Sequence, residues 1–344
     1  MPKNKLPRLR EPHGEPVQQV RDLFMKNYRL IDSEEERKQA YYDEDVRQVE
    51  TMSFLVQRCV IIKRKQVDEA YKMLDAMLRW RRKHFIRELT DRSFAREFFL
   101  CGAAFVYEPD VFGNKTLYVR PHLLRNVLEL KQAFKEFLAY LIYRIDDSVD
   151  GASFALIFDL SNTLWQHYDF DMLMHLLSLL RDYYPVNIDY VLAINFPWIL
   201  TAAWTVVKRL IPPERRDVVA FVSSKDVVNN FVKPENLPDF LGGTCARPHQ
   251  YTPKNCKSIV ELLLEWRELA RRESNSTNSS SINNNNNNNN NSTDNQEPQT
   301  QHSAIHASMS DKRIAEIIKV FDELVHRDDN KFMHDEFERL INNQ

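Results

Sequence analysis

The stretch DYVLAINFPWILTAAWTVV, residues Asp189–Val207, decides how this chain folds. It opens with the short apolar run Tyr190–Ile194, and Pro197 interrupts it near its middle. A helical spacing of i, i+4 and i+7 then places three apolar residues on one face, namely Leu200, Trp204 and Val207. Although residues 191–207 carry no charge, the run is too short for a membrane span, and proline suits the first turn of a helix. The stretch therefore predicts a buried strand followed by an amphipathic helix.

Further strand-like runs surround this stretch. Residues 153–158 are almost continuously apolar and end at Asp159, and residues 217–222 form a similar run. Residues 103–107 and 115–120 are also strand-like, and the loop between them contains Gly113, as in a hairpin. Helical patterns at 130–145 and 170–180 separate the later strands. This alternation predicts an α/β fold with a mixed, mostly parallel sheet, flanking helices and right-handed crossovers.

The composition argues against several classes of function. The chain has 344 residues, and its net charge of −2 gives no support for a nucleic-acid partner. The four cysteines form no CxxC pair, and the six glycines form no phosphate-binding loop. His122, His167 and His175 are isolated, and Asp159 is expected to bind backbone N–H groups of a loop. We therefore expect a protein that is not an enzyme and holds no metal and no cofactor.

Hydrophobic patterning divides the chain into segments. Residues 1–16 are polar and expected to be disordered, whereas residues 17–90 carry helical apolar stripes. The cations of Trp80–Lys83, at the end of one such helix, are expected to form a solvated face. Residues 91–245 hold the α/β domain, and residues 256–272 one further helix. Residues 274–301, with an unbroken asparagine run from 283 to 291, predict a disordered linker.

Residues 311–342 recover a helical apolar stripe after this linker. Phe321–Leu324 and Asp335–Phe337 faintly resemble the helices that flank an EF-hand loop. However, Val325 and Arg327 occupy positions where a calcium site needs oxygen donors. A pair of helices that contacts a protein partner is therefore the preferred interpretation.

Three motifs carry a resemblance to a known family. They are RDYYP at Arg181–Pro185, INFPW at Ile194–Trp198 and ENLPDFLGGT at Glu235–Thr244. In this order and spacing they resemble the CRAL-TRIO lipid-binding family, over roughly Ser53 to Thr244, and most closely the branch that also carries a motile-sperm domain. The resemblance implies the CRAL-TRIO fold, with a helical N-terminal subdomain, a central sheet and a lid helix over an apolar cavity.

The resemblance also implies which residues line that cavity. The lining would come from one face of three strands and from the lid helix, at Phe154, Leu156, Phe158, Val191, Ala193, Val218, Ala220, Leu200, Trp204 and Val207. Each of these residues taken alone reads as ordinary core, and the sequence leaves open whether the space is empty or filled.

Four cations near the end of the lid helix are candidates for contact with a membrane. Lys208, Arg209, Arg215 and Arg216 would hold anionic headgroups, or would be solvated cations that complement the helix dipole. The expected partners are a lipid or other hydrophobic small molecule, a transient membrane surface, and a protein bound through the C-terminal helices. The N-terminus lacks the apolar segment of a signal peptide, so we expect a cytoplasmic, peripherally membrane-associated protein. The alternative is a non-catalytic adaptor whose filled domain serves as a scaffold.

Departures from the family bear on the headgroup of the ligand. In the phosphatidylinositol-transfer branch, a glutamate follows Tyr-Tyr-Pro and a lysine opens the last strand. This chain has Val186 and Asp217 at the corresponding positions. Where that branch uses strand hydroxyls to bind phosphatidylcholine, this chain has Phe154 and Leu156. The resemblance therefore implies that phosphatidylinositol is not a preferred ligand.

Overall fold

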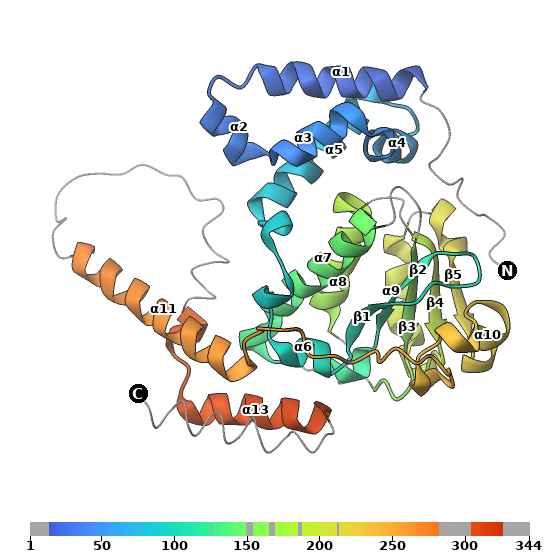
Figure 1. The fold of residues 1–344 in the computed structure, drawn as a ribbon, viewed down its shortest axis with the longest axis vertical. Helices are drawn as coiled ribbons and strands as arrows, with labels where there is room; N and C mark the ends of the chain where they lie inside the picture. The colour runs from blue at the N-terminus through green and yellow to red at the C-terminus, as the bar shows by residue number, and fades with distance from the viewer. Residues whose placement is uncertain are drawn as a thin grey trace. The chain divides into compact units, whose positions relative to one another are not determined.

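The structure is a computed structural model that describes residues 14–124, 126–148, 154–164, 169–184, 188–211, 213–281 and 304–325. The chain divides into two compact units, and the elements of both are labelled in Figure 1. The first unit comprises Met1–Thr90, Ala103–Leu124 and Lys135–His249. The second unit comprises Asp91–Gly102, Arg125–Phe134 and Gln250–Gln344. Residues 1–13 of the expected disordered lead-in, residues 1–16, lie outside the described residues.

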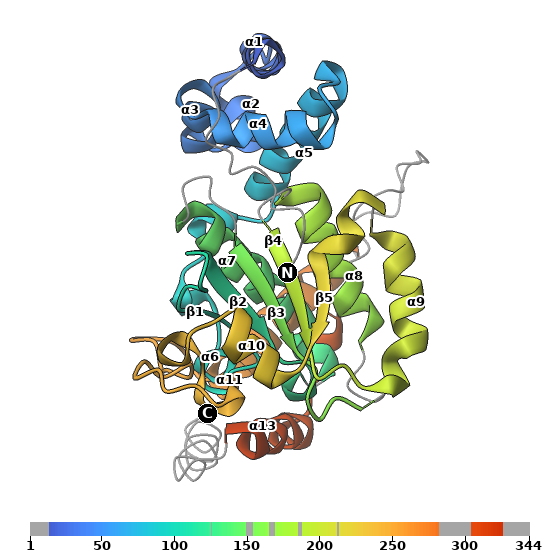
Figure 2. The ribbon, with the colours of Figure 1, turned by 90° about the vertical axis from the view of Figure 1, so that its right-hand side faces the viewer.

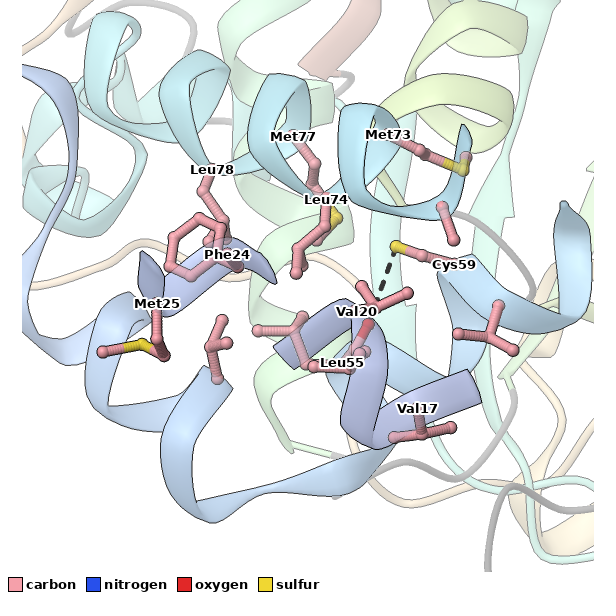
Figure 3. Close-up of a cluster of buried hydrophobic side chains, with 14 of the residues drawn as sticks. Val17, Val20, Phe24, Met25, Leu55, Cys59, Met73, Leu74, Met77 and Leu78 are labelled. Carbon is pink, nitrogen blue, oxygen red and sulfur yellow. Dashed lines mark hydrogen bonds between the residues drawn. The ribbon is translucent and has the colours of Figure 1, made fainter. Parts of the chain in front are cut away.

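Five helices open the first unit, and they form the helical N-terminal part that the sequence predicts. They are α1 (Glu15–Arg29), α2 (Glu34–Ala40), α3 (Asp43–Thr51), α4 (Ser53–Ile62) and α5 (Val67–Lys83). The Ser33 hydroxyl accepts a hydrogen bond from the Glu36 backbone N–H at 3.1 Å and so caps α2. Apolar residues of α1, α3, α4 and α5 meet in one core, where Phe24, Leu55 and Leu74 point toward one another (Figure 3). The stripe periodicity in the sequence is therefore sufficient to define this helical subdomain.

A buried ion-pair network joins these helices to α7 (Lys131–Ser148). Arg58 Nη1 lies 2.9 Å and 3.1 Å from the two carboxylate oxygens of Asp146, and Arg81 Nη2 lies 3.3 Å from one of them. Arg81 Nη1 also lies 3.4 Å from Asp45 Oδ1, and its guanidinium lies over the Tyr184 ring at 5.3 Å. Arg58 and Arg81 are both buried. The expectation of a wholly solvated basic face at Trp80–Lys83 is therefore wrong for Arg81.

A five-stranded sheet follows, in the order β1-β2-β3-β4-β5. The strands are β1 (Ala104–Tyr107), β2 (Lys115–Val119), β3 (Phe154–Asp159), β4 (Ile188–Ile194) and β5 (Val219–Val222). β1 pairs antiparallel with β2, and every other neighbouring pair is parallel. The predicted mixed, mostly parallel sheet is confirmed. α8 (Phe170–Ser178) and α7 lie on one face of the sheet, and α10 (Ser224–Asn230) lies on the other (Figure 2).

The α10 side of the sheet is a closed core. Tyr118, Ile157, Tyr190 and Leu192 pack there with Val227 of α10. The ENLPDFLGGT motif closes this core with Leu237 and Leu241, at the turns η9 (Pro234–Asn236) and η10 (Asp239–Leu241). A Cβ atom at Gly243 would lie 1.9 Å from the Leu237 carbonyl oxygen, so only glycine fits where the chain passes this carbonyl.

Short helical turns connect these elements. They are η1 (Ile86–Glu88), η2 (Asp91–Ser93), η3 (Pro121–Leu123), η4 (Leu128–Leu130), the π-helical turn η6 (Leu179–Tyr183), η7 (Trp198–Leu200) and η8 (Pro213–Val218). In η6, the first tyrosine of the RDYYP motif, Tyr183, stacks on Trp80 of α5 at 4.3 Å. The motif therefore provides a contact for the N-terminal helices.

The second unit consists of α6 (Arg96–Leu100), η4, the start of α7, α11 (Ile259–Ser281) and α13 (Asp311–Val325). α11 continues beyond residue 274, where the sequence predicts a linker, because a helix that is already formed adds residues more easily than it begins. The apolar stripe of α13 is buried within this unit at Ile314, Ile317, Ile318, Phe321, Leu324 and Val325. The protein contact expected through residues 311–342 stays a prediction, and the part of this segment beyond Val325 lies outside the described residues.

Candidate functional site

The strand register determines which candidate side chains share a face of the sheet. Leu156 pairs with Val191, and Phe158 pairs with Ala193. Because paired positions on neighbouring strands point to the same side, these residues and Phe154 lie on the face opposite to the α10 core. The expected strand positions on β3 and β4 are thus brought together on one apolar face.

The expected residues of β5 are wrong by one position. Ala220 pairs with Leu192 and packs against the α10-side core, whereas Val218 is the last residue of η8. Val219 and Phe221 pair with Val191 and Ala193 and therefore share the apolar face. The six-residue turn η8 delays the start of the strand, and a shift of one residue moves each side chain to the other face. The alternation of residues along a strand does not identify Val219 and Phe221 from the sequence, because the sequence does not show where β5 begins.

α9 (Thr201–Leu210) and η7 present the predicted helical face inward. Leu200 and Val207 are buried, and Trp204 is partly buried. The Trp204 ring meets the Phe221 ring edge-on at 4.9 Å, and Phe196 meets the same ring from another side, also at 4.9 Å. The helix therefore packs on the β5 end of the apolar face through aromatic edge contacts.

The apolar face is covered unevenly. Phe154 and Leu156 are fully buried, while Phe158 and Val191 are only half-buried and Phe221 is 45% exposed. On the α10 side of the same strands, by contrast, Tyr190, Leu192 and Ile194 are fully buried. The β4–β5 end of this face therefore keeps apolar surface that the described residues leave exposed.

The neighbouring helix α8 has the same character. Its apolar residues Met172, Leu173, Met174 and Leu177 are only half-buried, and Phe170 is 46% exposed. An amphipathic helix on a sheet normally buries its apolar stripe, so α8 also leaves apolar side chains exposed. Trp198, at the start of η7, is 85% exposed.

The cations near the end of α9 divide into two kinds. Lys208 and Arg209 are exposed in the last turn. Arg216 instead donates through Nε to the backbone oxygens of Lys208 at 2.9 Å and Ile211 at 3.1 Å. It therefore satisfies carbonyl groups at the helix end. The side chain of Arg215 lies outside the described part of the chain.

The described residues offer little for catalysis. Burial lowers the pKa of His175, whose Nε2 lies 3.2 Å from the Lys135 backbone oxygen. Asp159 accepts a hydrogen bond from the Ser161 N–H at 3.1 Å, as expected of a loop ligand. In the described ranges no three His, Cys, Asp or Glu side chains gather as metal ligands would. His167 lies outside these ranges.

No described helix is long and apolar enough to cross a membrane.

Comparisons with known proteins agree with this architecture. The CRAL/TRIO domain model matches residues 101–243. A solved structure, the crystal structure of Sfh5, superposes with a TM-score of 0.51 at 14% identity and covers 75% of this chain and 99% of its own. The fold is therefore the CRAL-TRIO fold, and residues 101–243 are the part of the chain that matches the CRAL/TRIO domain model.

Curated relatives are distant and longer. The phosphatidylinositol transfer protein CSR1 of Eremothecium gossypii is 25% identical over 146 residues, which cover 41% of this chain and 33% of that protein. Protein real-time of Drosophila melanogaster is 26% identical over 203 residues, which cover 52% of this chain and 30% of that protein. The chain thus spans about a third of the length of these relatives.

Proposed function

We propose that this chain binds a lipid or other hydrophobic small molecule on the apolar face beneath α9, without transforming it, and exchanges it at membranes. The observation that carries the proposal is the exposed apolar surface at the β4–β5 end of the sheet, which includes Phe221. The CRAL/TRIO domain and a relative named as a phosphatidylinositol transfer protein support it. In this proposal α9 is the lid helix.

The free-energy cost of exposing a lipid to water explains why exchange of the ligand would need a membrane. Two acyl chains carry roughly 30 methylene groups, and each costs about 0.8 kcal/mol to expose to water. A lid that opens against a bilayer avoids most of this cost. Exposed Trp198 suits the polar–apolar boundary of a bilayer, and Lys208 and Arg209 suit anionic headgroups at about 1 kcal/mol per charge. The protein would then act in the cytoplasm and on membrane surfaces.

The adaptor alternative has less support. It requires the domain to be a filled scaffold and the C-terminal helices to recruit partners. The apolar stripe of α13 is already used inside the second unit, and the face under α9 is incompletely covered.

We also propose, from the INFPW and LPDFLGGT motifs, that the closest similarity is to the lipid-domain part of motile-sperm-domain-containing protein 2.

Occupancy tests the proposed function. Protein purified from cells under native conditions is expected to carry close to one hydrophobic molecule per chain, because the uncovered surface at Phe221 favours apolar contact. Extraction followed by mass spectrometry, with protein concentration from absorbance, gives the ratio. A chain that yields no extractable lipid and takes up none from liposomes would support the adaptor instead.

Competition between lipids tests the headgroup. We expect phosphatidylinositol to load less well than a sterol or tocopherol, because the exposed carboxylate of Asp217 stands where the phosphatidylinositol-transfer branch has a cation. The second departure, Val186, lies outside the described residues. Labelled phosphatidylinositol, phosphatidylcholine and a sterol are offered together, and saturable loading is compared. Preferential loading of phosphatidylinositol would show that this chain follows its relative CSR1.

A further inference from the structure

The second unit contains a surface that binds a helix. It is formed by α6, η4 and α11, and we call it the α13 receptor surface because α13 lies on it. Three of its residues carry the contact, namely Phe98 of α6, Glu129 of η4 and Arg267 of α11, and all three are buried. Two of the three are charged, and charged side chains are rarely buried without a partner.

The apolar part of the contact comes from one face of α13. Ile314, Ile317 and Ile318 are almost completely buried, and the Phe321 ring centre lies 6.4 Å from that of Phe98. The spacing of these residues is that of a helix lying in a groove, with anchors at i, i+3, i+4 and i+7. The segment before α13 adds His306, whose ring stacks on Trp266 of α11 at 5.2 Å.

Two ion pairs fix the direction of the bound helix. Arg313 binds Glu129 with both arms of its guanidinium, Nε to Oε1 at 2.7 Å and Nη2 to Oε2 at 3.0 Å. Asp311 Oδ1 accepts from Arg267 Nη1 at 2.5 Å. The hydrogen bonds and charge of Arg313 hold the pKa of the Glu129 carboxyl below its usual value. A helix bound in the opposite direction would place its charges against the wrong partners. The surface therefore selects the direction of the bound helix as well as its shape.

The receptor surface is held together without α13. The Glu97 carboxylate accepts a hydrogen bond from the Ile259 N–H at 2.8 Å, where α11 begins, and Arg96 N–H donates to the Lys257 carbonyl at 3.0 Å. The Phe98 ring also packs on Phe134, at 5.3 Å. These contacts tie α6 to α11 and to the start of α7 without using α13, so the proposal below requires that they hold the surface when α13 leaves it.

The covalent connection to α13 is long. Residues 282–303 join α11 to the segment that carries α13, and most of them are asparagine, serine, threonine and glutamine. A covalent connection between two binding elements gives the tethered one an effective concentration on the order of millimolar. A second helix of the same chemistry, present at a lower concentration, binds in only two cases. Either the contact of the tethered helix is weakened, or the second helix binds the surface more tightly than the tethered helix does.

We propose that the α13 receptor surface is a binding site for an amphipathic helix of a partner protein, and that α13 is its built-in competitor. The partner helix would carry an acidic residue, a basic residue two positions later, and an apolar stripe that begins at the next position. This is the pattern of Asp311, Arg313 and Ile314 in α13 itself. Displacement of α13 would expose the buried charges Glu129 and Arg267 to their new partners.

The test uses the full chain and a fluorescent synthetic peptide of residues 304–325. In Arg313→Glu, like charges face each other across the Glu129 contact, and α13 is expected to detach. Hydrogen exchange in 311–325 should rise at least about tenfold, and the peptide should bind at least about tenfold more tightly than to the unchanged chain. In the double variant Glu129→Arg, Arg313→Glu the pair is restored in reverse, so α13 should bind again and exclude the peptide.

Two further variants keep the outcome decisive. Lys319→Glu makes the same charge change on the exposed side of α13 and should alter neither readout. Ile317→Asp detaches α13 from its apolar side and should behave as Arg313→Glu does. If both release variants lose hydrogen-exchange protection throughout α11, α13 is an integral part of the core and the proposal is wrong. It is equally wrong if α13 stays protected, if the released chain ignores the peptide, or if the unchanged chain exchanges α13 between two copies as a concentration-dependent dimer.

Discussion

Trp204→Asp is expected to abolish lipid loading and lipid transfer by this chain. Trp204 is partly buried on the inner side of α9, and its ring meets Phe221 at 4.9 Å, at the uncovered end of the apolar face. The substitution would place a carboxylate against the proposed ligand, and an unpaired charge in apolar surroundings costs several kcal/mol. We expect at least about a tenfold fall in bound lipid and in the rate of transfer between liposomes.

The neighbouring residue supplies a matched control. Thr205 lies on the same helix but is exposed, and its hydroxyl donates only to the Thr201 carbonyl within α9. Thr205→Asp therefore adds the same charge to the same helix without reaching the apolar face, and it should load and transfer lipid normally. Circular dichroism separates loss of binding from loss of fold. Normal transfer by folded Trp204→Asp would show that α9 is not the lid.

Asp146→Ala is expected to have the largest effect on stability. The carboxylate of Asp146 is the shared partner of Arg58 and Arg81, and both arginines are buried. Removing it leaves two guanidinium groups buried without that partner, which costs roughly 3–5 kcal/mol when a buried pair is broken from one side. Denaturant unfolding followed by circular dichroism should show a correspondingly lower midpoint, with the N-terminal helices losing their attachment to α7.

A surface pair provides the comparison for this variant. Glu34 and Lys38 form an exposed ion pair along α2, with side chains that are 78% and 56% accessible. Because water screens such a pair, Glu34→Ala should leave the unfolding midpoint unchanged. Asp146→Asn keeps the shape and part of the hydrogen bonding, so it should fall between the two. Equal midpoints for Asp146→Ala and Glu34→Ala would mean that the network contributes nothing to stability.

Local patterns in the sequence determined the main elements. The run Tyr190–Ile194 lies in β4, and the helical spacing of Leu200, Trp204 and Val207 places these residues on the inner side of η7 and α9. Period-2 and period-3.6 repeats are properties of single elements, so they can be read without knowing what packs against them. The stripes of the N-terminal helices and the alternation of strands with helices followed from the same rule.

Only the tertiary structure decided how these elements meet. The turn η8 set the register of β5 and put Phe221, not Ala220, on the apolar face. A fold in three dimensions was also needed to bring Asp146 to Arg81, and to bring Glu129 to Arg313. These contacts join residues far apart in the chain, and their formation depends on burial and charge pairing that no local pattern records.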